Sequence, residues 1–151
     1  MITPTPGAPA EGTIQIGSRS TLPLRIPWAI PFGRDTGPLL SSVRLSKQSF
    51  KPSDTTPAVL SFRAGGLTRG PEGTEVHPVG RLDMVLTNSF GSHLGLLVRV
   101  RDLLPGSYAF GLTGRDPNGN TLPAGDYTLA LAALPPDGSR ATYRKVTFTI
   151  K

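Results

Sequence analysis

The stretch Leu104–Leu134, LPGSYAFGLTGRDPNGNTLPAGDYTLALAAL, decides the fold that we expect for this chain. Large side chains occupy every second position in two parts of it, first Tyr108, Phe110 and Leu112, then Tyr127, Leu129 and Leu131. Alternation with a period of two places one set of side chains on one face of a sheet, above a core. The stretch therefore predicts two β-strands, which we expect to form a hairpin around one long loop.

Each of these strands follows a Pro and Gly turn and opens on a tyrosine. Tyr108 and Tyr127 are therefore candidates for structural tyrosines whose hydroxyl groups bond back to the backbone, as in the tyrosine corner of β-sandwiches. Their positions at strand starts favour this role over sugar stacking.

Further strands are expected on both sides of this stretch. The apolar runs lie at residues 13–16, 41–45, 58–64, 81–88, 96–102 and 142–150, and turn residues separate them. About eight or nine strands without a convincing helix predict an all-β fold, a two-sheet antiparallel β-sandwich, with a barrel as the alternative. Residues 65–80 are polar and Gly-rich and read as a long loop, a candidate for function or disorder.

Near the start of the chain, apolar residues alternate with three prolines. We expect this run to form an edge strand that serves as an interaction strip, because proline cannot donate to a β-ladder. Its members are Leu22, Leu24, Ile26, Trp28, Ile30 and Phe32. Residues 1–12 contain three prolines and read as a flexible linker, so residues 13–151 are expected to form a single domain.

The composition excludes several classes of function. The chain has no Cys, which removes disulfides, thiolate nucleophiles and Cys-ligated metals. The net charge is +6, but the basic residues are scattered and favour a solvated sheet face over nucleic-acid binding. No apolar run is long enough to span a membrane. The first residues lack the charged start and apolar core of a signal peptide, so we expect any export signal elsewhere in a longer parent chain.

No residue set has the pattern of a catalytic site, and we expect no enzymatic activity. His77 and His93 are the two histidines, and no G-x-S-x-G motif accompanies them. Two histidines without Cys also argue against a zinc site. No cofactor is expected.

Asp116, Asn118 and Asn120 place oxygen-bearing side chains at alternate positions, as calcium loops do. The glycine and glutamate that complete such a loop are missing, which favours an Asn-Gly turn. An isopeptide bond between Asn88 and Lys47 or Lys145 has no motif to support it.

The segment GLTGRDPNGNTLPAGDYTLAL resembles the immunoglobulin-like domain of flagellar hook-assembly proteins. More of the chain resembles the C-terminal accessory domain of bacterial subtilisin-like serine proteases. That resemblance rests on LRIPWAIPF, on the run from Phe50 to Phe62 and on RDLLPGSYAFGLTGR, and it covers most of residues 20–151. It implies an immunoglobulin-like or fibronectin type III-like module without a catalytic triad.

From this resemblance we expect an extracellular or cell-surface location and a non-catalytic accessory role. The expected partner is a neighbouring domain of a longer parent chain, or another protein. Alternatives are a module that binds a polysaccharide or cell surface, and a self-assembling structural protein. Sugar binding would need exposed aromatic side chains on one face, for which the candidates are Trp28, Phe32, Phe90 and Tyr143.

Overall fold

The computed structural model describes residues 10–16, 24–30, 38–71 and 73–151, and these contain β-strands but no helix. Accordingly, no helix in the described part of the chain is long and apolar enough to cross a membrane. Contacts divide the chain into two units, Met1–Thr36 and Gly37–Lys151. A strand begins at Ala10, inside the linker predicted at residues 1–12, and the boundary between the two units lies after Thr36.

The first unit contains the antiparallel pair of β1 (Ala10–Ile16) and β2 (Leu24–Ile30), in which Ile14 faces Ile26. Four residues of the predicted edge strand lie in β2, namely Leu24, Ile26, Trp28 and Ile30. Strand β2 has one neighbouring strand and is an edge strand, but it belongs to a separate two-stranded sheet with β1; its role as an interaction strip stays a prediction. Leu22 and Phe32 lie outside the described residues.

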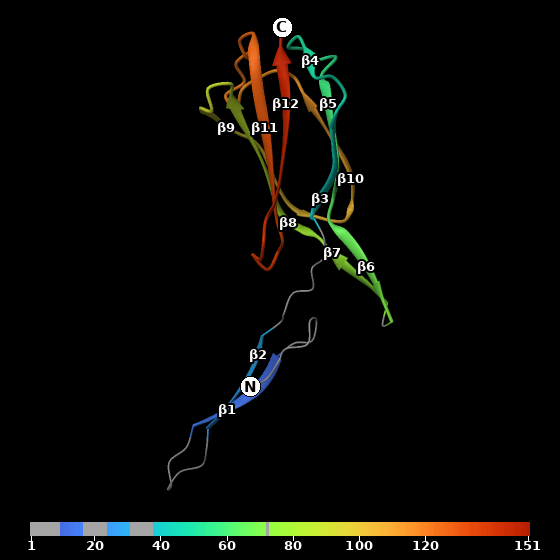
Figure 1. The fold of residues 1–151 in the computed structure, drawn as a ribbon, viewed down its shortest axis with the longest axis vertical. Coiled ribbons are helices and arrows are strands. Elements are labelled where there is room, and N and C mark those ends of the chain that lie inside the picture. Colours follow the sequence, from blue (N-terminus) through green and yellow to red (C-terminus); the bar gives the residue numbers. More distant parts are fainter. Residues whose placement is uncertain (1–9, 17–23, 31–37, 72) are drawn as a thin grey trace. The chain divides into compact units, whose positions relative to one another are not determined.

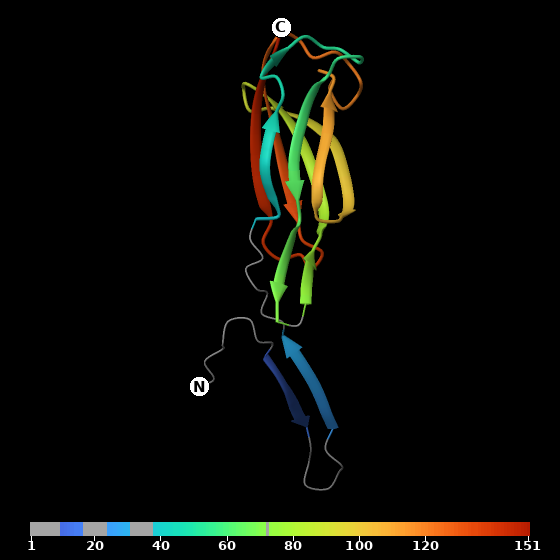
Figure 2. The ribbon, with the colours of Figure 1, turned by 90° about the vertical axis from the view of Figure 1, so that its right-hand side faces the viewer.

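The second unit, called here the larger unit, contains two main sheets that face each other in Figure 1 and Figure 2. The three-stranded sheet has the order β10 (Gly106–Leu112), β5 (Ala58–Ala64), β3 (Leu40–Leu45). The five-stranded sheet has the order β4 (Ser49–Phe50), β12 (Thr142–Ile150), β11 (Gly125–Leu134), β8 (Val79–Asn88), β9 (His93–Leu103). All pairs are antiparallel except β4 with β12.

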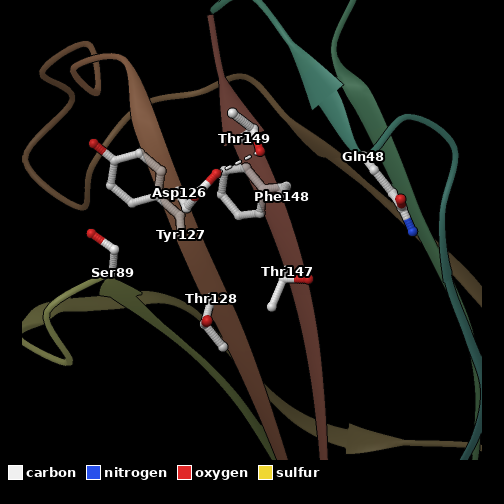
Figure 3. A pocket seen from close by; sticks show the side chains of 8 residues that line it. All are labelled: Gln48, Ser89, Asp126, Tyr127, Thr128, Thr147, Phe148 and Thr149. Carbon is white, nitrogen blue, oxygen red and sulfur yellow. Dashed lines mark hydrogen bonds between the residues drawn. The ribbon is translucent and has the colours of Figure 1, made fainter.

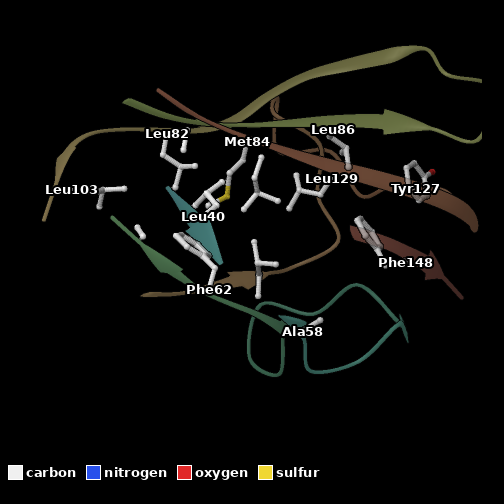
Figure 4. Close-up of a cluster of buried hydrophobic side chains, with 14 of the residues drawn as sticks. Leu40, Ala58, Phe62, Leu82, Met84, Leu86, Leu103, Tyr127, Leu129 and Phe148 are labelled. Carbon is white, nitrogen blue, oxygen red and sulfur yellow. The ribbon is translucent and has the colours of Figure 1, made fainter. Parts of the chain in front are cut away.

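One hydrophobic core lies between these sheets, and both contribute side chains to it (Figure 4). The alternation read from the sequence sets the contributions. In β5 every second residue is buried, and in β11 the buried positions are Tyr127, Leu129, Leu131 and Ala133. Leu60 and Leu129 have no exposed surface, so each sheet has at least one fully buried side chain.

The predicted hairpin of residues 108–134 is wrong. Strand β10 pairs with β5 in one sheet, whereas β11 pairs with β8 and β12 in the other. The segment between them crosses from sheet to sheet. Alternation places side chains on a face but does not choose the neighbouring strand, so the sequence could not distinguish a hairpin from a crossover.

The predicted loop at residues 65–80 is also wrong. It contains β6 (Gly66–Gly70) and β7 (Gly73–His77), an antiparallel ribbon that extends from the end of the larger unit in Figure 1. Gly65 joins β5 to β6 with a φ of 68°, and a Cβ there would lie 2.7 Å from the His77 carbonyl oxygen. The ribbon thus continues β5 and β8, which belong to different sheets. With it and the short β4, the larger unit has ten strands, not eight or nine.

Candidate functional site

Three acidic side chains that could take part in catalysis or metal binding are instead held in structural contacts. Asp83 is the one charged residue that is buried in the described part of the chain. Its carboxylate accepts two hydrogen bonds from Arg99, at 2.7 Å from Nε and 2.9 Å from the terminal nitrogen. The Arg81 Nε lies 3.3 Å away on the other side. The Arg99 hydrogen bonds and the charges of the surrounding arginines hold the pKa of Asp83 below its ordinary value.

Asp54 and Arg115 form a second bidentate pair, with distances of 2.9 and 2.6 Å. The hydrogen bonds and charge of Arg115 lower the pKa of Asp54, and Asp54 raises that of Arg115. Arg115 also donates to the Gly119 carbonyl oxygen at 3.0 Å. This pair therefore ties the crossover between β10 and β11 to the loop before β5.

The three calcium candidates close a turn in that crossover. One Asp116 oxygen accepts the backbone N–H groups of Asn118 and Asn120, and the other accepts the Asn120 side-chain amide at 3.1 Å. These hydrogen bonds, led by that of the Asn120 side chain, lower the pKa of Asp116. Since donors already occupy both Asp116 oxygens, the geometry is that of a turn. No group of three or more metal-binding side chains occurs among the described residues.

The two tyrosines have the same contact in different sheets. The Tyr108 hydroxyl donates to the Leu104 carbonyl oxygen at 2.7 Å, and the Tyr127 hydroxyl donates to the Pro123 carbonyl oxygen at 2.9 Å. Tyr127 is buried against Phe148. Tyr108 is half-buried and stacks on Phe62. Both residues anchor the turn that precedes their strand.

The two histidines lie in different strands, and Asn88 lies next to His93. His77 is within 3.0 Å of the Thr68 hydroxyl across the β6–β7 ribbon, and His93 begins β9 and pairs with Thr87. Asn88 caps the turn before β9 by accepting the N–H groups of Phe90 and Ser92. Its side-chain oxygen is therefore engaged in the turn.

The two aromatic candidates for sugar stacking that the structure describes, Phe90 and Tyr143, lie in different places. Phe90 is exposed in the turn after β8, and Tyr143 is exposed on β12. Tyr143 pairs with Ala132, while Asn88, two residues before Phe90, pairs with Tyr127, so the backbone positions of Tyr143 and Asn88 lie roughly 17 Å apart along the sheet. The side chains of Trp28 and Phe32 fall outside what the structure describes.

A shallow polar depression of about 380 Å³ lies over one end of the five-stranded sheet (Figure 3). The Thr149 hydroxyl donates to Asp126 at 2.6 Å within it. Hydroxyl and amide groups of Gln48, Ser89, Thr128 and Thr147 line it as well, together with Tyr127 and Phe148. The depression can donate and accept hydrogen bonds, but none of these hydroxyl groups is paired with a histidine. Sequence reasoning missed it, although polar side chains at alternate positions, Asp126 and Thr128 in one strand and Thr147 and Thr149 in the next, were a signal.

Strand edges form the other candidate surface. The edges of β3, β9 and β12 carry devices that oppose pairing with another chain. Strand β3 has a register shift, and β9 has two register shifts in its pairing with β8 and carries Arg99 and Arg101. Strand β12 carries Arg144 and Lys145. Strand β10 has none of these devices. It contains no charged residue or proline, and it pairs with β5 over all seven residues without a shift.

No protein-family model matches this sequence, and no curated protein is significantly similar to it.

Proposed function

We propose that the larger unit is a β-sandwich of the immunoglobulin or fibronectin type III class. The strand orders support this proposal. Strands β3, β5 and β10 take the positions of A, B and E, and β12, β11 and β8 take those of G, F and C. The remaining long strand, β9, pairs with the C-like strand β8. A constant-type immunoglobulin domain instead places its additional strand beside E, in the other sheet. The Tyr127 hydroxyl bond at the start of the F-like strand adds support.

We further propose that this sandwich is a non-catalytic accessory module of a secreted bacterial protein, attached to a subtilisin-like protease. The observation that carries the proposal is that acidic side chains are engaged in structural hydrogen bonds. Asp54, Asp83 and Asp116 each hold a sheet or a loop in place through at least two hydrogen bonds. A domain that uses its charged groups in this way offers surfaces for packing or tethering, and its proposed place of action is extracellular or at the cell surface.

Deletion of residues 37–151 from the native gene product tests this role. We expect the parent protein to lose thermal stability or surface localisation while its turnover at low temperature is retained. The matched control is Ser61→Lys, which adds one charge to an exposed position without removing the module. A deletion that leaves stability and localisation unchanged would defeat the proposal, and so would labelling of the isolated chain by a serine-reactive probe.

The polar depression supports a second candidate function, binding of a neutral polysaccharide. Sugar hydroxyl groups can exchange hydrogen bonds with Asp126, Thr128 and Thr147. Titration with soluble cell-wall glycans should then cause NMR shifts at these residues, and Thr128→Val should weaken the binding. Shifts scattered over the surface, or an unchanged affinity in Thr128→Val, would reject this candidate.

A further inference from the structure

We propose that the edge of β10 pairs with the same edge of a second copy, antiparallel about a twofold axis. The pairing joins the two three-stranded sheets into one six-stranded sheet. It follows from the unprotected edge of β10 and does not depend on the accessory role proposed above. An antiparallel pair of identical strands is self-complementary, as a twofold interface requires.

One register uses the whole strand. With Ala109 opposite Ala109 of the second copy, all seven residues of β10 find a partner. Tyr108 then faces Phe110, Leu112 faces Gly106, and Ser107 faces Gly111. Each large terminal side chain is opposite a glycine, and the aromatic residues form two cross-strand pairs of a favourable kind.

Charge does not oppose this register. Strand β10 itself is uncharged, and the nearest outward-facing charge is Arg63 on β5, which pairs with Ser107. In the joined sheet the two Arg63 residues are three strand spacings apart across the seam, about 14 Å, and four residues apart along the strands, about 13 Å, so about 19 Å separates them. That separation exceeds the screening length of about 8 Å at physiological salt. Repulsion across the seam is therefore weak, although each copy carries a net charge of +6.

The larger unit is open on the β10 side. On the opposite side, the residue before β3 is joined to β12 by the hydrogen bond from Leu39 N–H to Thr142, at 3.1 Å. Between β9 and β10 the two sheets leave a cavity of about 180 Å³, lined in part by Leu97, Val98, Phe110 and Leu112. These four side chains are only partly buried. A second copy at the β10 edge would cover these partly buried core side chains.

Single cysteines test the register, because the chain has none of its own. In Ala109→Cys the two Cα atoms lie about 4.5–5.5 Å apart across the axis, within the range that a disulfide bridges. In Ser107→Cys they lie four residues apart along the strand, about 13 Å, which a disulfide cannot span. Ser61→Cys, on β5 beside Ala109, places the thiol one strand away from the edge.

We expect Ala109→Cys to form a disulfide-linked dimer under mild oxidation and the two control variants to remain monomers. Sedimentation of the cysteine-free chain should show a concentration-dependent dimer. Ala109→Lys should raise its dissociation constant at least about tenfold, whereas Ser61→Lys should leave it within about twofold. Linkage at residue 107 but not 109, equal linkage at all three positions, or a monomer at every concentration would overturn the proposal.

Discussion

Strands β10 and β11 begin alike and end in different environments. Each follows a Leu-Pro turn, and the third residue of each is a tyrosine whose hydroxyl bonds to the carbonyl four residues earlier. Strand β10 has one neighbour, and its large residues are half-buried, whereas β11 has two neighbours and its Tyr127, Leu129 and Leu131 are buried. Local sequence therefore sets where a strand starts and which residues share a face, while the position of the strand in the sheet sets what those residues contribute.

Matched leucine substitutions measure this difference most directly. Leu129→Ala in β11 removes a side chain with no exposed surface and should cost about 2–5 kcal/mol of the free energy of unfolding. Leu112→Ala in β10 removes a half-buried side chain and should cost about 1–2 kcal/mol. Urea denaturation of both variants provides the values. Equal losses would mean that the half-exposed side of the core is as tightly packed as its centre.

The paired tyrosines give a smaller contrast. Tyr127→Phe leaves the Pro123 carbonyl oxygen without its partner in a part-buried position and should cost about 1–1.5 kcal/mol. Tyr108→Phe releases an exposed carbonyl oxygen that water can satisfy, and should cost about 0.5 kcal/mol or less. Thermal and urea unfolding of the two variants would test the order. A larger loss for Tyr108→Phe would show that the first turn, and not the second, stabilises the larger unit.

Acid should loosen the crossover that separates the two strands. The pKa values of Asp54, Asp83 and Asp116 are lowered from the ordinary value of 3.8, so the unfolded chain takes up these protons first. Their contribution to stability is complete above about pH 4 and is lost as the pH falls through the folded pKa values. Amide NMR shifts of Asn118 and Asn120 should report a midpoint below 3.8 for Asp116. A midpoint at or above 3.8 would contradict the hydrogen bonding described for this turn.

Asp83, on the outer face of β8 beside β11, offers a further small effect. Asp83→Asn keeps the shape of the side chain but removes its charge next to Arg99 and Arg81. Because the arginines are partly exposed, solvent screens the pair, and we expect a loss of about 0.5–1 kcal/mol at pH 7. The loss should shrink as the pH falls through the lowered pKa of Asp83, because the wild-type carboxylate then becomes protonated. A loss that stays constant as the pH falls would assign the effect to packing instead of charge.

The sequence predicted the strands more accurately than their neighbours. The alternation in residues 58–64 and 125–134 identified two strands and their buried faces, because burial repeats with the period of the pleat. The predicted pairing of β10 with β11 was wrong, since alternation carries no information on which strand lies alongside. The ribbon at 66–77 was not predicted because most of its residues are polar or glycine and its apolar residues, Leu67 and Val76, are exposed. The depression around Asp126 was not predicted because its lining comes from four separate parts of the chain.

The β6–β7 ribbon has a consequence for the speed of folding. A flexible connection between β5 and β8 would have to close at an entropic cost before the two sheets could meet. The ribbon replaces that closure with a short turn near Gly70 and Gly73, from which pairing can proceed one residue at a time to Gly66 and His77. Pairing of the ribbon brings the end of β5 and the start of β8 to adjacent positions. We expect Gly65→Ala, which strains the end of the ribbon next to β5, to slow refolding as well as to lower stability.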